Sequence, residues 1–114
     1  MDVAVIDAVA ASSARRLGRS LYHGADVLLA VEVVSRGSDG EREDRGRKVT
    51  EYALAGIPQY WIVDFDPEPR IQVLRLTGSP GRYGAPQVFS GDDTVKVEDP
   101  FPVSFPLSDL QDFV

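Results

Sequence analysis

The sequence predicts an α/β fold in which a mixed β-sheet is built around a strand, helix and strand crossover. Three segments support this prediction. Val27–Val34 is an apolar run in which only Glu32 is charged, residues 41–55 have the charge pattern of a helix, and Gln59–Phe65 is again β-branched and aromatic. Because two strands joined by one helix form a parallel pair with a right-handed connection, these segments define the centre of the sheet.

The helix predicted over residues 41–55 has clear end signals. Ser38 or Asp39 can cap its N-terminus, acidic residues in its first turn oppose the positive end of the helix dipole, and Gly56 provides a left-handed terminator. Its core-facing residues are expected to be Val49, Tyr52 and Ala53. Gly46 lies inside the helix, where it costs about 1 kcal/mol relative to alanine unless it marks a close approach.

The remaining strands are expected to pair antiparallel with this centre. Asp2–Ile6 is short and partly β-branched, and it should return across the sheet beside the Glu32 strand. Ile71–Leu76 alternates apolar with polar residues and should form a hairpin with the preceding strand. Further along we expect short strands at Gln87–Phe89 and Thr94–Glu98, an irregular stretch at Pro100–Pro106 and a terminal helix at Leu107–Val114.

Composition limits the classes of protein that the chain can belong to. At 114 residues and 43% hydrophobic, it has the size of one globular domain with a single core. Its 12 basic and 18 acidic residues give a net charge of −6, which argues against a nonspecific polyanion binder. The charge does not exclude nucleic acid as a substrate, because enzymes that cut phosphodiesters carry acidic metal sites. With no apolar run of membrane-spanning length and no signal-peptide pattern, we expect a cytoplasmic protein.

The chain has no cysteine and one histidine, which restricts its metal chemistry. Disulfide frameworks, thiolate zinc sites and the usual histidine triad for zinc are excluded. Any metal site must therefore consist mostly of oxygen ligands. Such ligands favour magnesium, manganese or calcium.

Glu32 is the best functional clue, because burying an unpaired carboxylate costs several kcal/mol unless it has a partner. Antiparallel pairing of the first strand would bring Asp2 beside Glu32, and the helix would bring Lys48 toward both. Two acids and a lysine could form a divalent-metal site for phosphodiester hydrolysis, with the lysine orienting a water or stabilising negative charge. In the alternative interpretation, Glu32 is a structural acid paired with Lys48.

Several motifs together resemble a known family. They are an early Asp-Val strand, the run LLAVEVVS, the four-residue spacing of Asp44, Lys48 and Tyr52, and the element AGIPQYWIVD. This pattern is similar to the bacterial Uma-type domain of unknown function, in the PD-(D/E)XK restriction-endonuclease-like superfamily. The resemblance implies a restriction-endonuclease-like mixed sheet and a nuclease that acts on DNA with Mg²⁺ or Mn²⁺ as cofactor.

The resemblance also implies roles for individual residues. Asp2, Glu32 and Lys48 take the catalytic places, with Asp2 and Glu32 as the metal ligands. Asp44 and Tyr52 are supporting residues. Lys48 is placed on the helix rather than the strand, because Val34 occupies the lysine position of the usual Glu-x-Lys motif.

Departures from the family pattern leave a second function open. Met1 stands where relatives have proline, so residues 1–114 are expected to form one domain that lacks the N-terminal helix and strand of the family. The chain could then be a catalytically inactive scaffold or interaction module that forms a homodimer through its N-terminal sheet edge. Tyr60 and Trp61 are expected to pack in the core or at its rim rather than to stack on bases.

Overall fold

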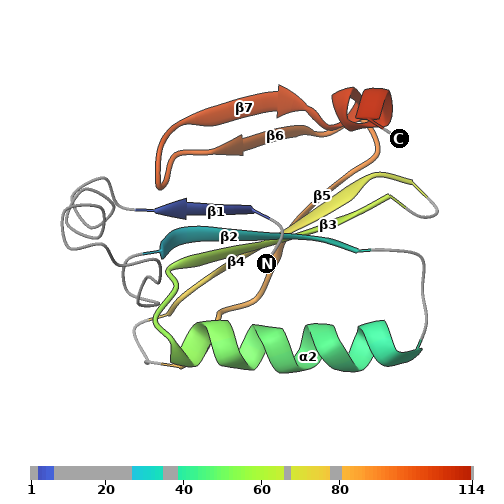
Figure 1. The fold of residues 1–114 in the computed structure, drawn as a ribbon. Coiled ribbons are helices and arrows are strands. Elements are labelled where there is room, and N and C mark those ends of the chain that lie inside the picture. The colour runs from blue at the N-terminus through green and yellow to red at the C-terminus, as the bar shows by residue number, and fades with distance from the viewer. Residues whose placement is uncertain (1–2, 7–26, 35–38, 66–67, 78–80, 114) are drawn as a thin grey trace, which may run out of the picture.

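The computed structural model describes residues 3–6, 27–34, 39–65, 68–77 and 81–113. Figure 1 shows three layers, with a five-stranded sheet between the helix α2 and a two-stranded hairpin. The elements of the sheet layer and the helix are β1 (Val3–Ile6), β2 (Val27–Val34), α2 (Asp39–Leu54), β3 (Gln59–Asp64), β4 (Arg70–Arg75) and β5 (Gln87–Ser90). The hairpin layer contains β6 (Thr94–Val97), β7 (Val103–Pro106) and the 3₁₀ helix η2 (Leu107–Phe113).

The strand order β1-β2-β3-β4-β5 confirms the predicted mixed sheet. β2 and β3 are parallel, with Glu32 opposite Ile62, and α2 connects them. β1 pairs antiparallel with β2, with Val3 opposite Val31. β3 with β4 and β4 with β5 are also antiparallel. The crossover therefore provides the parallel pair, and the other strands extend the sheet on both sides of it.

Helix α2 begins two residues before the predicted start at residue 41 and ends one residue before the predicted end at residue 55, with Gly56 as the predicted terminator. Gly56 has a φ of 83°. The N–H of Gly56 donates to the carbonyl of Ala53, and the N–H of Ile57 donates to that of Tyr52, both at 3.1 Å. This double hydrogen bond is the Schellman arrangement, which satisfies carbonyls of the last turn. The proposed cap Ser38 lies outside the described residues.

Each face of the sheet packs its own hydrophobic cluster. The cluster under α2 consists of Val27, Ala30, Ile57, Tyr60, Ile62 and Leu74. The cluster under the hairpin consists of Leu29, Trp61, Val63, Ile71, Val73, Phe89, Val95, Val97 and Leu107. Tyr60 and Trp61 are both buried, one on each side of the sheet, which confirms that they pack in the core. Residues that alternate along a strand therefore alternate between the two layers.

One expectation for the C-terminal region was wrong. Pro100–Pro106 is not irregular throughout, because Val103–Pro106 forms β7 and pairs with β6. The two prolines of the segment FPVSFP obscured this strand, yet β7 has β6 as its paired neighbour, and a strand at an edge tolerates proline. The segment after it forms the predicted terminal helix, which is a 3₁₀ helix over Leu107–Phe113. It starts at the fully buried Leu107, whose N–H donates to the carbonyl of Asp93.

A buried glutamine attaches the hairpin to the sheet. Gln59 is 4% exposed, and its Nε2 donates to the carbonyl of Asp99, in the connection between β6 and β7, at 3.0 Å. Its Oε1 accepts a hydrogen bond from Trp61 Nε1. Both ends of the amide are therefore satisfied, which compensates for its burial. Nothing in the local sequence indicated this role.

Gly46 and Gly56 should respond in opposite directions to substitution by alanine. A methyl group added at either position would meet no heavy atom within 4 Å, so packing does not decide the outcome. Gly46→Ala should stabilise the protein by up to about 1 kcal/mol, because alanine has the higher helix propensity. Gly56→Ala should destabilise it by about 1 to 2 kcal/mol, because φ is positive there. Urea denaturation of both variants measures the difference. Equal effects of the two substitutions would show that the left-handed conformation of Gly56 has no bearing on stability.

Candidate functional site

Glu32 lies on the face of β2 that is covered by α2. Its neighbours in the strand, Val31 and Val33, point to the other face, while Ala30 packs in the cluster under α2. Glu32 is 7% exposed, which makes it one of two buried polar or charged residues among those described. The strand thus places a carboxylate at the boundary between sheet and helix, two residues before β2 ends.

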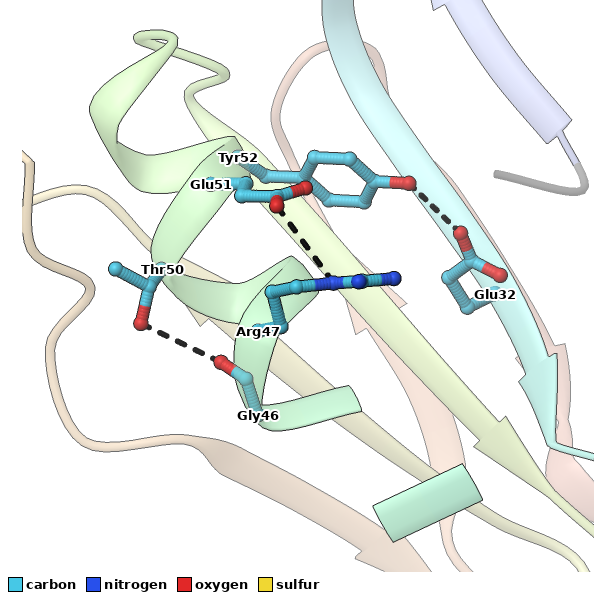
Figure 2. A network of polar contacts seen from close by, with 6 residues as sticks. All are labelled: Glu32, Gly46, Arg47, Thr50, Glu51 and Tyr52. Atoms are coloured by element: carbon cyan, nitrogen blue, oxygen red, sulfur yellow. Dashed lines mark hydrogen bonds and ion pairs between the residues drawn. The ribbon is translucent and has the colours of Figure 1, made fainter. Parts of the chain in front are cut away.

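Helix α2 supplies a partner for each oxygen of this carboxylate. The hydroxyl of Tyr52 donates to Glu32 Oε1 at 2.9 Å, as Figure 2 shows. Lys48 Nζ lies 3.4 Å from Glu32 Oε2. Because residues four apart in a helix lie on the same side, one turn of α2 presents both groups to β2. The sequence prediction that Lys48 would reach Glu32 therefore agrees with the geometry.

The surroundings keep Tyr52 a neutral hydrogen-bond donor. Burial raises its pKa well above that of an exposed tyrosine, and the hydrogen bond to Glu32 and the charge of that carboxylate raise it further. The ring also packs edge-on against Tyr60, with centroids 5.1 Å apart and planes at 80°. The Tyr52 side chain is thus held at its hydroxyl by Glu32 and at its ring by Tyr60.

The cluster reaches solvent through Lys48. Its side chain is 27% exposed, whereas that of Glu32 is 9% exposed. A buried acid beside a partly exposed cation can stabilise a charge or orient a polar group that arrives from solvent. The arrangement is therefore able to support acid, base or electrostatic chemistry at the helix edge.

Two of the predicted site residues cannot be placed in this cluster. Asp2 lies outside the described residues, although the next residue, Val3, is opposite Val31 in the register of β1 and β2. Asp44 lies in α2, one turn before Lys48, but its side chain is outside the described part of the structure. Within the described residues, no three or more acidic, histidine or cysteine side chains form a group that could hold a metal ion.

A second polar pair on α2 was not predicted from the sequence. Arg47 Nε lies 3.6 Å from Glu51 Oε1, and both side chains are well exposed, at 66% and 59%. The Arg-x-x-x-Glu spacing of an ion pair on a helix was the available signal. In Figure 2 the side chains of Arg47 and Tyr52 both extend from α2 toward the side of β2 that carries Glu32.

Comparison with known proteins identifies the family of this chain. The pattern of the Uma2 family, described as "Putative restriction endonuclease", matches residues 2–108. The chain belongs to the Uma2 family. The matched range includes α2 and all of the strands from β1 to β7. It therefore also includes Glu32, Lys48 and Tyr52. No curated protein and no solved structure matches the chain with significance.

Membership of the Uma2 family indicates a nuclease-like function, with DNA as the substrate class. Restriction-endonuclease-like families generally use divalent metals. The mixed sheet and its single crossover helix among the described residues are consistent with that fold. None of the described helices is both long and apolar enough to cross a membrane.

The contact between Lys48 and Glu32 should have a measurable coupling energy. Lys48→Met removes a cation from beside the buried carboxylate, so it should destabilise the protein by about 1 to 3 kcal/mol. Glu32→Gln combined with Lys48→Met should cost less than the sum of the two single changes, because the charge is then absent. Urea denaturation of the four proteins gives the coupling energy. Strict additivity would show that the pair does not interact.

Tyrosine burial should make the protein sensitive to alkali. Tyr83 donates to the carbonyl of Ile57 at 2.8 Å, and burial raises its pKa to about 12. Since the folded state holds this proton more tightly, the stabilisation is complete below the unfolded pKa of about 10 and is lost as pH rises toward the folded value. Tyr83→Phe should lose less stability than wild type between about pH 10 and 12. Parallel losses in urea denaturation would exclude a contribution from Tyr83.

Proposed function

We propose that the protein is a magnesium- or manganese-dependent nuclease that hydrolyses DNA phosphodiester bonds with an activated water. One observation carries this proposal: Glu32 is buried on β2, yet it meets Lys48 at the edge of α2 where solvent can enter. A purely apolar interface would be the simpler solution at this position, because a buried ion pair seldom adds stability over hydrophobic packing.

The donor chemistry of Glu32 suits a hard divalent cation, which prefers carboxylate oxygens. We propose Asp2 as the second ligand, since it directly precedes Val3, and Val3 is paired with the residue before Glu32. A cation bound by Asp2 and Glu32 would polarise the phosphate and lower the pKa of a water. The chain's own contribution is to hold these oxygens and to bring the phosphate beside them.

Lys48 and Tyr52 have different roles in this proposal. Lys48 orients the water or stabilises negative charge that develops on the phosphate. Tyr52 fixes the orientation of the carboxylate through Oε1, which leaves Oε2 on the side of Lys48. Asp44, one turn before Lys48 in α2, is proposed to support the lysine. The position of the usual strand lysine is occupied by Val34, which is partly buried.

Metal binding and cleavage should both depend on Glu32. Mg²⁺ or Mn²⁺ should raise the melting temperature of wild type, and calorimetry should detect binding. Glu32→Gln, which keeps the size of the side chain, should lose the thermal shift and nick plasmid DNA at least about 100-fold more slowly. Glu51→Gln removes an exposed acid from the same helix and should retain both properties.

Two outcomes would contradict the nuclease proposal. One is metal binding by wild type without cleavage of any DNA substrate tried. The other is unchanged cleavage in the Glu32→Gln variant, which would remove Glu32 from the active site.

A catalytically silent scaffold is the second candidate. The observation that favours it is that both oxygens of Glu32 already have protein partners, as in a purely structural ion pair. In this case Glu32 would only fix α2 on the sheet, and the edge strand β1 would be the surface for a second copy. The same metal titration separates the candidates, because the scaffold predicts no thermal shift in a folded protein.

A further inference from the structure

We infer that Arg47 is a substrate-binding residue that holds a phosphate of the DNA backbone beside Glu32. This inference rests on the proposed nuclease function and adds the residue that would bind the substrate rather than the metal. Three features of the structure support it: the position of Arg47 on α2, the engagement of Lys48 with Glu32, and the exposure of the Arg47 side chain.

The first feature is the position of Arg47 around the helix. Successive residues turn by about 100°, so the side of α2 that carries Lys48 and Tyr52 is flanked by the ridge of Arg47 and Glu51. Val49 and Ala53 lie on the other flank, where they line a pocket of about 320 Å³ with Leu74 of β4 and other residues. A substrate that approaches the solvent edge of the Glu32 cluster alongside α2 therefore meets Arg47 and not the pocket side.

The second feature is the charge balance of the site. Lys48 Nζ lies 3.4 Å from Glu32 Oε2, so the lysine already compensates the buried acid. In the proposed function the metal and Lys48 serve the reacting phosphate, so a neighbouring phosphate of the DNA backbone needs a cation of its own. Arg47 is the neighbouring residue in the chain, and its guanidinium group can donate two parallel hydrogen bonds to a phosphate.

The third feature is the exposure of Arg47. Its Nε is 3.6 Å from Glu51 Oε1, and more than half of each side chain is exposed. Exposed ion pairs of this kind contribute about 0 to 1 kcal/mol. The guanidinium group of Arg47 is therefore accessible to a phosphate that arrives from solvent.

Arg82 provides a matched control. It is also an exposed arginine, but it lines the pocket on the opposite flank of α2. Removing it changes the net charge by the same amount as removing Arg47. A difference in DNA affinity between the Arg47 and Arg82 variants is therefore due to the position of the arginine and not to the net charge of the protein.

The test is binding of a fluorescent DNA duplex, followed by anisotropy at several salt concentrations, with Ca²⁺ in place of Mg²⁺ to slow cleavage. Arg47→Ala should weaken binding about 10-fold and reduce the slope of log K against log salt by about one. Arg47→Lys should recover part of the affinity, because it restores the charge but not the two-bond geometry. Arg82→Ala should leave affinity and slope close to those of wild type. Glu51→Gln should bind as tightly as wild type or more tightly.

The outcomes distinguish this inference from the function on which it rests. If wild type binds and cleaves DNA but Arg47→Ala and Arg82→Ala behave alike, the role of Arg47 is overturned and the nuclease proposal stands. If wild type binds no DNA, both are overturned. Melting temperatures of the variants should remain at the wild-type value, because neither arginine is buried; a large drop for Arg47→Ala would assign it a structural role instead.

Discussion

The buried carboxylate of Glu32 is the constraint on which the arrangement of helix and sheet depends. A charge at 7% exposure must be compensated, and the compensation comes from two residues one turn apart on α2. These contacts constrain the rotation of the helix about its own axis, because hydrogen bonds are directional. The same contacts place Lys48 at the rim and Tyr52 against the core.

The opposite face of the sheet is organised by a different polar group. Gln59, the first residue of β3, donates a hydrogen bond to the connection between the two strands of the hairpin. The apolar cluster around Trp61 fills the space between the layers. Both faces therefore combine one buried polar anchor with a hydrophobic cluster. The two anchors differ in chemistry, since the neutral amide is satisfied inside the protein while the Glu32 cluster opens to solvent through Lys48. This difference is why function is proposed on the face covered by α2.

Family membership and site geometry contribute separate information. The Uma2 match extends from residue 2 to residue 108 and indicates a nuclease-like protein. The geometry concerns a few atoms and shows that an acid, a lysine and a tyrosine meet where β2 and α2 face each other. Together they favour phosphodiester chemistry at this edge over a binding role for the buried aromatic residues.

The sequence by itself determined the crossover, since the apolar run of β2, the glycine after α2 and the aromatic strand β3 are local signals with one consistent interpretation. It also singled out Glu32 and Lys48, because a lone charge in an apolar strand requires a partner. Only the tertiary structure decided that Gln59 anchors the hairpin and that Val103–Pro106 pairs with β6. The first feature depends on a contact between residues 40 positions apart in the chain. The second is obscured in the sequence by Pro102 and Pro106, so no local pattern indicates either.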